Sequence, residues 1–182
     1  MRIISGIYGG RVLSGKIPAN IRPTTDYARE SLFDTLGSLI DIEGKVFLDL
    51  FAGTGAVGLE ALSRNTHKVN FIDKSRDSIN YIKSNIDKLE IPKEKYEIIK
   101  ADAIEYLSNI NNFEKFDFIF ADPPYIENYL WRICQIVSEK TLLYEGGIII
   151  YETDSKRTEL IPPNFRILKE QVSGNAKFYL IH

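Results

Sequence analysis

From residue 45 onward the sequence alternates short apolar stretches with stretches of helical periodicity, and this alternation restricts the possible folds more than any other feature. The apolar stretches are nearly continuous, as expected for strands that are buried on both faces of a parallel sheet. The predicted strands are 46–51, 68–73, 96–100, 116–121 and 147–151. The predicted helices between them are 57–63, 75–89, 103–109 and 129–138. The alternation predicts an α/β fold with a mostly parallel, doubly wound sheet that carries helices on both faces.

The two ends of the chain depart from this alternation. Near the carboxyl end, the predicted strands 165–170 and 177–182 are separated by a loop too short for a crossover helix, so we expect them to pair antiparallel. Near the amino end, 2–5 and 11–13 flank a glycine-containing stretch and predict a short β-hairpin. Thr25 can cap a helix that runs to about residue 38. We therefore expect an amino-terminal arm at 1–24, followed by one domain with a single core at 25–182.

Composition excludes several classes of protein. With 182 residues, 44% of them hydrophobic, the chain is long enough for one buried core. Its apolar runs are far shorter than the ~18–20 residues of a membrane span, and its start lacks the apolar stretch of a secretory signal, so we expect a cytoplasmic enzyme. Cys134 is the only cysteine, and His67 and His182 are the only histidines. We expect no intrachain disulfide and no metal site.

Positive charge is concentrated at the amino end. The net charge of −2 argues against a protein that coats nucleic acid without specificity. Residues 1–29 nevertheless carry five basic residues against one acidic residue, which gives this segment +4 and leaves −6 for the other 153 residues. The basic residues are Arg2, Arg11, Lys16, Arg22 and Arg29. They form either an arm for nucleic acid or a solvated surface segment with a chance bias in charge.

A glycine-rich segment at residues 49–58 separates the first predicted strand from its helix. Gly53, Gly55 and Gly58 match the pattern G-x-G-x-x-G, and Asp73 follows at the spacing of a residue that binds ribose hydroxyls. Alone, this pattern also suits a dinucleotide-binding oxidoreductase. Asp49 favours another ligand, because a carboxylate at the mouth of the loop would repel a pyrophosphate. S-adenosylmethionine has no phosphate and carries an ammonium and a sulfonium, which carboxylates attract.

Further residues at strand ends extend this predicted cofactor site. Asp102 and Ala103 follow the third strand and can approach the adenine amine, although Asp102 could instead be only a helix cap. In a doubly wound sheet, ligands bind at the carboxyl ends of the strands where the strand order reverses, so Gly53 and Asp122 should meet across that crevice. The predicted cofactor-binding residues are Asp49, Phe51, Ala52, Gly53, Gly55, Asp73, Asp102, Ala103 and Asp122.

The tetrad Asp122-Pro123-Pro124-Tyr125 follows a predicted buried strand and suits the binding of a planar amine. Proline has a carbonyl but no N–H, so Pro123 adds an acceptor beside the Asp122 carboxylate, and the two can hold both protons of an NH2 group. Tyr125 offers a flat face on which a base can stack. Taken alone, the prolines could merely end the strand. Together with the glycine loop, the tetrad indicates methylation of an exocyclic amine, with Asp122, Pro123 and Tyr125 as the predicted catalytic residues.

Together these segments resemble the RsmD family, bacterial methyltransferases that modify guanine N2 in small-subunit (16S) ribosomal RNA. The resemblance covers nearly the whole chain and rests on residues 22–26, 29–30, 32–33, 49–55, 60–64 and 122–125. Many members have Phe where this chain has Tyr125, which keeps the stacking face. Residues 22–26 distinguish this family, because other amine methyltransferases share the glycine loop and the tetrad.

The resemblance implies a Rossmann-like class I methyltransferase with seven strands, the last of them antiparallel. It also implies S-adenosylmethionine as the methyl donor, S-adenosylhomocysteine as the product, and 16S rRNA in the assembled small subunit as the substrate. Arg2, Arg11, Lys16 and Arg22 would contact this RNA. Arg29 is a further candidate, unless it only helps to start its helix. We expect a monomer.

Other functions remain open at this point. A DNA adenine-N6 methyltransferase usually needs an additional target-recognition region, for which the chain leaves little room. A release-factor glutamine-N5 methyltransferase usually has Asn in place of Asp122. A noncatalytic S-adenosylmethionine-binding RNA chaperone would fail a radiolabelled methyl-transfer assay. A nicotinamide oxidoreductase would be stabilised by NAD rather than by S-adenosylmethionine.

Overall fold

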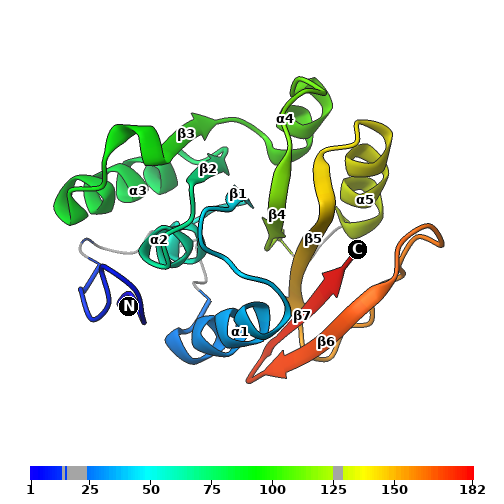
Figure 1. Ribbon diagram of the computed structural model, residues 1–182, viewed down its shortest axis with the longest axis horizontal. Coiled ribbons are helices and arrows are strands. Elements are labelled where there is room, and N and C mark those ends of the chain that lie inside the picture. The colour runs from blue at the N-terminus through cyan, green and yellow to red at the C-terminus, as the bar shows by residue number, and fades with distance from the viewer. Residues whose placement is uncertain (14, 16–23, 125–128) are drawn as a thin grey trace.

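The computed structural model describes residues 1–13, 15, 24–124 and 129–182, and the statements below refer to these residues. They form a central sheet between two layers of helices (Figure 1). The strands are β1 (Val46–Leu50), β2 (Lys68–Asp73), β3 (Tyr96–Lys100), β4 (Phe116–Ala121), β5 (Leu143–Asp154), β6 (Ile167–Ser173) and β7 (Ala176–Ile181). The helices are α1 (Asp26–Leu39), α2 (Ala56–Ser63), α3 (Arg76–Leu89), α4 (Ala103–Asn109) and α5 (Tyr129–Glu139), with a 3-10 turn, η1 (Lys93–Lys95).

The sheet has the order β3-β2-β1-β4-β5-β7-β6. Strand β7 pairs antiparallel with both of its neighbours, and the other pairs are parallel, so β7 alone runs against the remaining strands. The predicted α/β fold with a seven-stranded, mostly parallel sheet is therefore confirmed. The strand order reverses between β1 and β4, which lie side by side. The crevice for a ligand is expected at the carboxyl ends of these two strands.

Strands β5 and β6 differ most from their predicted bounds, while β1 differs by one residue at one end and β7 by one residue at each end. Strand β5 begins at Leu143, four residues before the predicted start, because its first residues are mostly exposed and lack an apolar signal. Strand β6 continues to Ser173, where the prediction placed a loop. The turn is shorter than predicted because Val172 and Ser173 still pair with Lys177 and Ala176. The predicted antiparallel pairing of these two strands is correct.

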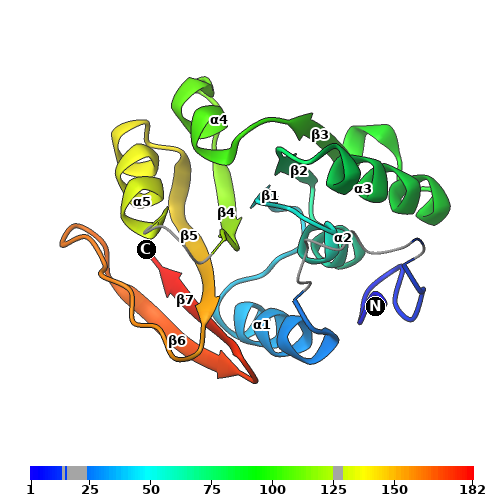
Figure 2. The same ribbon diagram turned by 180° about the vertical axis from the view of Figure 1, so that it is seen from behind.

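The two faces of the sheet carry different helices. Helices α1, α2 and α3 cover one face, and their apolar residues share a core with Phe47, Phe71 and Phe118 of the sheet. Helices α4 and α5 cover the other face and share a core with Leu48, Ile119 and further strand residues. Figure 2 shows the same arrangement from behind, with α4 and α5 on the side away from α1.

The amino-terminal segment lies against the first of these layers. One antiparallel bridge joins Arg2 to Val12, as predicted for a short hairpin. Ile3 and Leu13 are buried in the core beneath α1, α2 and α3, so the hairpin packs on the domain. Thr25 caps α1 as predicted, because its side chain accepts a hydrogen bond from the Ala28 amide.

None of the helices in the described part of the chain combines the length and the apolar character that a bilayer-spanning segment needs.

Candidate active site

The turn from β1 into α2 has a left-handed backbone at three positions. Phe51 has φ 58°, Gly53 has φ 53° and Gly55 has φ 70°. Glycine adopts this region without steric cost, whereas Phe51 does so against the usual preference of a side-chain-bearing residue. The loop is held by a hydrogen bond from the Ala52 amide to the Ile72 carbonyl at 2.9 Å and by one from Gly55 to Ala52 at 2.6 Å. The amides at the start of α2 are thereby brought to the carboxyl end of β1.

Gly58 lets α2 pack directly on the sheet. A Cβ atom at this position would lie 2.3 Å from the ring of Phe71 and 2.9 Å from Oδ2 of Asp49. A Cβ atom on Gly55 would lie 2.7 Å from the side chain of Ile82. Both glycines therefore serve close packing around the loop, which is one of the known uses of such glycines.

Asp49 is a buried carboxyl group beneath this loop. Its Oδ2 accepts a hydrogen bond from the Gly58 amide at 3.0 Å, while none of the described residues donates one to Oδ1. Burial raises the pKa of Asp49 to about 8; the Gly58 amide opposes this rise, and repulsion from Asp73 and Glu152 adds to it. A buried carboxyl group with an unpartnered oxygen suits a ligand that brings positive charge or a hydrogen-bond donor.

Asp73 links the end of β2 to the glycine loop. Its Oδ2 accepts a hydrogen bond from the Gly53 amide at 2.7 Å, and its Oδ1 accepts one from the Ser75 amide, also at 2.7 Å. Each carboxylate oxygen has a second lone pair, so these bonds still leave capacity for a ribose hydroxyl. The spacing in the sequence indicated a ribose contact but not this structural role in holding the loop.

Asp102 caps α4. Its Oδ1 accepts hydrogen bonds from the amides of Ile104 and Glu105 at 3.0 and 3.2 Å. The alternative interpretation of Asp102 as a helix cap is therefore confirmed. Ala103, the first residue of α4, is buried. A contact of either residue with adenine stays a prediction.

Asp122 and Pro123 leave the sheet beside the glycine loop. Leu50 of β1 pairs with Ala121 of β4, so the chain positions that follow them, Phe51 and Asp122, end adjacent strands. The side chain of Asp122 lies close enough to Tyr151 of β5 to help raise the pKa of that phenol, although burial is the main cause. Asp122 is half-buried and Pro123 is buried. The predicted amine clamp thus begins at the edge of the expected ligand crevice.

An aromatic contact joins the glycine loop to the start of α5. The rings of Phe51, in the glycine loop, and Tyr129, at the start of α5, meet edge to face with centroids 5.1 Å apart. The start of α5 therefore lies against the glycine loop. Tyr125, the predicted stacking residue, lies outside the described residues.

A buried polar network places the start of α1 beside the clamp. Oγ1 of Thr24 donates to Oε2 of Glu152 in β5 at 2.8 Å, and Arg29 donates to the Thr24 carbonyl at 3.1 Å. The Arg29 guanidinium also binds Asp26 at 3.1 Å and the carbonyl of Arg2. Arg29 is completely buried, so the prediction that it contacts RNA is wrong for this conformation. Its structural role is to hold three groups together: the Arg2 carbonyl of the arm, Asp26 at the start of α1 and the Thr24 carbonyl.

The other predicted RNA contacts are exposed where the structure describes them. The side chain of Arg2 is 65% exposed and lies 3.9 Å from Asp26, a weak surface ion pair. Arg11 is exposed, with its guanidinium 5.7 Å from the ring centroid of Tyr8. Lys16 and Arg22 lie outside the described residues.

Sequence reasoning missed two buried acids, Glu60 and Glu152. Both stand inside apolar stretches, Leu59-Glu60-Ala61 and Tyr151-Glu152, and both are at most 4% exposed. A carboxylate in an apolar stretch is costly unless it is paired, and this was the available signal. No group of three or more potential metal ligands occurs in the described part of the chain.

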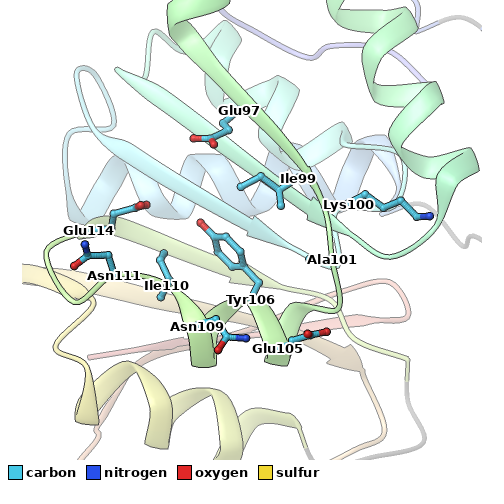
Figure 3. A pocket seen from close by; sticks show the side chains of 10 residues that line it. All are labelled: Glu97, Ile99, Lys100, Ala101, Glu105, Tyr106, Asn109, Ile110, Asn111 and Glu114. Atoms are coloured by element: carbon cyan, nitrogen blue, oxygen red, sulfur yellow. The ribbon is translucent and has the colours of Figure 1, made fainter.

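A groove of about 470 Å³ lies apart from these residues, between the edge strand β3 and α4. Figure 3 shows Tyr106 in the middle of the groove, with Glu97 and Glu114 near its rim. Burial raises the pKa of the Tyr106 phenol to about 12, and a polar interaction with the Asn70 side chain opposes this rise. None of the predicted site residues lines the groove, so it is not part of the candidate active site.

The sheet order and the residues at the ends of β1, β2 and β4 define a Rossmann-like enzyme of the methyltransferase class. The chain belongs to the family described as Conserved hypothetical protein 95, whose model matches residues 1–182. The predicted resemblance to RsmD proteins is thereby confirmed, because curated relatives of that name match almost the full chain.

Two relatives illustrate this relationship. The Ribosomal RNA small subunit methyltransferase D of Haemophilus influenzae is 33% identical over 180 residues, which cover 99% of this chain and 92% of the relative. The Putative rRNA methyltransferase YlbH of Bacillus subtilis is 39% identical over 155 residues, which cover 85% and 83%.

Two solved structures share the fold over nearly their whole length. The putative methyltransferase yhhF from Escherichia coli has a TM-score of 0.84 and 27% identity, and the match covers 100% of this chain and 96% of that one. The putative methylase HI0767 from Haemophilus influenzae has a TM-score of 0.80 and 32% identity, with coverage of 99% and 96%.

Proposed function

We propose that this chain transfers a methyl group from S-adenosylmethionine to the exocyclic N2 amine of a guanine in 16S ribosomal RNA, within the assembled small subunit. The observation that carries the proposal is the position of Asp122 and Pro123 at the end of β4, next to the glycine loop at the end of β1. Membership of a family with curated rRNA methyltransferases supports the substrate class. The choice of guanine N2 rests on the resemblance and on the clamp chemistry.

The residues at the strand ends fit the cofactor. The unpartnered Oδ1 of Asp49 lies in a buried position where a cationic ligand would relieve the cost of ionisation. Asp73 would bind the ribose, and Asp102 and Ala103 would border the adenine. The loop residues Phe51, Ala52, Gly53 and Gly55 would contact the cofactor through the backbone. S-adenosylmethionine supplies an electrophilic methyl group on its sulfonium.

The clamp residues act on the amine. The lone pair of guanine N2 is delocalised into the ring, so the nitrogen becomes a better nucleophile as it turns pyramidal. Hydrogen bonds from the amine to the Asp122 carboxylate and the Pro123 carbonyl strengthen in that geometry, which lowers the barrier. Tyr125 would hold the extruded base by stacking, a contact of about 1–3 kcal/mol. After transfer, Asp122 or water takes the proton that the nitrogen releases.

The substrate would lie across the amino-terminal hairpin as well as the clamp. Arg2 and Arg11 are exposed cations on the hairpin, and Lys16 and Arg22 complete the proposed contacts with phosphate. We further propose that the protein acts as a monomer in the cytoplasm and needs no metal ion.

The decisive experiment uses small ribosomal subunits from cells that lack this protein. The purified protein and isotope-labelled S-adenosylmethionine are added, and the labelled nucleotide is identified by mass spectrometry. We expect a single N2-methylguanosine in 16S RNA and much weaker labelling of protein-free RNA. Labelling of an adenine, of a protein or of no acceptor would contradict the proposal.

A further inference from the structure

Glu60 of α2 is a completely buried carboxylate that binds the backbone of the amino-terminal hairpin. Its Oε2 accepts a hydrogen bond from the Ile4 amide at 2.7 Å, and its Oε1 accepts one from the Ser5 amide at 3.0 Å. Arg64, one turn further along the chain, donates to Oε1 at 3.0 Å and neutralises the charge. Both carboxylate oxygens therefore accept hydrogen bonds, and the donors belong to the hairpin and to Arg64 rather than to the proposed cofactor site.

Ser63, at the end of the same helix, binds the next residues of the hairpin. The Tyr8 amide donates to its Oγ at 3.0 Å, and this hydroxyl donates to the Ser5 carbonyl. The Ile7 amide donates to the Ser63 carbonyl at 2.7 Å. Carbonyls at the carboxyl end of a helix lack hydrogen-bond donors within the helix, and here the hairpin supplies the donor for the Ser63 carbonyl.

The hairpin depends on this docking. It has one bridge between Arg2 and Val12, and an isolated two-stranded hairpin is at best marginally stable in water. Besides α2, it is held by Ile3 and Leu13 in the core and by Lys88 of α3, which donates to the Val12 carbonyl at 2.8 Å. Without the contacts with α2, the hairpin would keep the backbone hydrogen bonds between its own residues but would lose the ones that fix its position on the domain.

Docking places the start of the hairpin between the glycine loop and α1. The sulfur of Met1 lies 3.8 Å from Oγ1 of Thr54 in the loop. The carbonyl of the next residue, Arg2, accepts a hydrogen bond from the buried guanidinium of Arg29 in α1. The side chain of Arg2 is 65% exposed. The backbone of Arg2 is therefore fixed beside α1, one residue from the contact between Met1 and the glycine loop.

We propose that Glu60 and Ser63 are positioning residues for the RNA substrate. They fix the hairpin so that Arg2 and Arg11 meet the phosphate backbone as a preorganised pair, without the loss of entropy that a disordered arm would suffer on binding. The inference rests on the proposed function and adds to it the side chains that orient the substrate-binding surface. It also accounts for Glu and Ser within residues 60–64, one of the segments of the family resemblance.

Two glycines of the hairpin offer a matched test. Gly6 has φ +84°, and a Cβ atom there would lie 1.9 Å from the Ser63 carbonyl oxygen. Gly10 has a similar φ of +80°, but a Cβ atom there meets nothing within 4 Å. Gly6→Ala and Gly10→Ala therefore impose similar backbone strain, while only Gly6→Ala pushes the hairpin off α2.

We expect Gly6→Ala to raise the KM for small subunits about tenfold with little change in kcat, because the electrostatic grip on phosphate is weakened. The Kd for S-adenosylmethionine should change by less than about twofold, because Gly6 meets the carboxyl end of α2 and the glycine loop lies before the start of that helix. Gly10→Ala should keep the KM of the wild type. Equal effects of the two substitutions, or a loss confined to kcat, would overturn the proposal.

Glu60→Gln tests the same docking from the side of the helix. An amide NH2 would face groups that now donate to the carboxylate, so the hairpin should detach although the side-chain volume is kept. Hydrogen exchange at residues 4–8 should become faster, and the salt dependence of RNA binding should fall by a slope of about 1 for each arginine lost from the contact. The double substitution Arg2→Gln and Arg11→Gln should produce the same loss of slope with unchanged exchange at residues 4–8.

The outcomes separate this inference from the proposed function. If the wild-type protein methylates no RNA, the proposed function fails. If it methylates small subunits and Glu60→Gln, folded by circular dichroism, keeps the wild-type KM and salt slope despite faster exchange at residues 4–8, only the positioning role fails. Protection at residues 4–8 that stays at the wild-type level would refute the docking itself.

Discussion

The two faces of the sheet bury very different side chains. Within the described part of the chain, the four buried charged residues are Arg29, Asp49, Glu60 and Glu152, and all belong to the face that α1, α2 and α3 cover. The core beneath α4 and α5 holds aliphatic and aromatic residues together with Cys134, and the polar side chain buried among them in β2, Asn70, carries no charge. Burial raises the pKa of this thiol to about 12, so it stays protonated and inert.

This difference separates two tasks. Burial of a charge is unfavourable unless partners compensate, so the face of α1, α2 and α3 gives up stability to hold loops and the hairpin in place. The opposite face buries no charged residue in the described part of the chain and gains its stability mainly from apolar burial. Substitutions of the buried charged residues on the first face should therefore change ligand binding, whereas substitutions of core residues on the second face, away from the strand ends that form the site, should change only the free energy of unfolding.

The largest effect is expected at Asp122, on the edge where both faces meet the crevice. Asp122→Ala removes the carboxylate acceptor for the amine, and kcat should fall at least about 100- to 1,000-fold, as when a preorganised hydrogen-bonding group is removed from an active site. Methyl transfer to small subunits measures this effect, and circular dichroism checks the fold. Near-normal turnover by a folded Asp122→Ala variant would remove Asp122 from the mechanism.

Leu142 tests the apolar face. It is fully buried and precedes β5, and its carbonyl binds the Phe116 amide at the start of β4, the end of that strand away from Asp122. Leu142→Ala should lower the free energy of unfolding by about 2–5 kcal/mol, which denaturant titration measures. The Kd for S-adenosylmethionine, measured below the unfolding transition, should stay at the wild-type value. A weakened Kd would show that this face also shapes the cofactor site.

The contrast between the faces was only partly visible in the sequence. Strands such as 68–73 and 116–121 were predicted with their observed bounds, because apolar runs between turn residues report burial directly. The polar contacts of the first face were not predicted, since Glu60 and the hairpin amides lie more than 50 positions apart in the chain. Periodicity shows that a residue lies on a helix, but it does not show what meets that residue in space.

The candidate site, too, was predictable from the sequence in one part and not in another. The ends of β1 and β4 could be brought together from strand order alone, because the switch in a doubly wound sheet fixes which strands are neighbours. Arg29 was misassigned because a positive charge near the amino end resembles a surface contact in sequence. Its burial follows from Thr24, Asp26 and Arg2, whose arrangement around it only the fold reveals.

Asp49, on the face that α1, α2 and α3 cover, should make the free energy of unfolding depend on pH. The ordinary pKa is 3.8 and that of the folded state is about 8, so between these values the folded protein holds a proton that the unfolded chain has lost. Stability should therefore decrease as pH rises from about 4 to 8, by up to about 1.4 kcal/mol per pH unit. Asp49→Asn should flatten this slope in denaturant titrations between pH 5 and 8.

Cofactor binding should depend on the same proton. A cationic ligand favours ionised Asp49, so the affinity for S-adenosylmethionine should increase with pH by up to about tenfold per unit below pH 8, with release of a proton. Calorimetry in buffers of different ionisation enthalpy measures the release, and Asp49→Asn should abolish it. A release of the same size in Asp49→Asn would assign the proton to another group.

The smallest effects are expected for alanine substitutions of two glycines, in α2 and α1, on the face that α1, α2 and α3 cover. Gly58→Ala in α2 would place a methyl group 2.3 Å from the fully buried ring of Phe71, and this overpacking should cost about 1–3 kcal/mol of unfolding free energy. Gly37→Ala in α1 meets nothing within 4 Å, so it should stabilise the protein by about 0.5–1 kcal/mol through helix propensity. Thermal unfolding of both variants measures the difference. If both changes shifted the midpoint in the same direction, α2 would have room to move away from the sheet, and the tight packing that holds Asp49 under the glycine loop would not be a constraint.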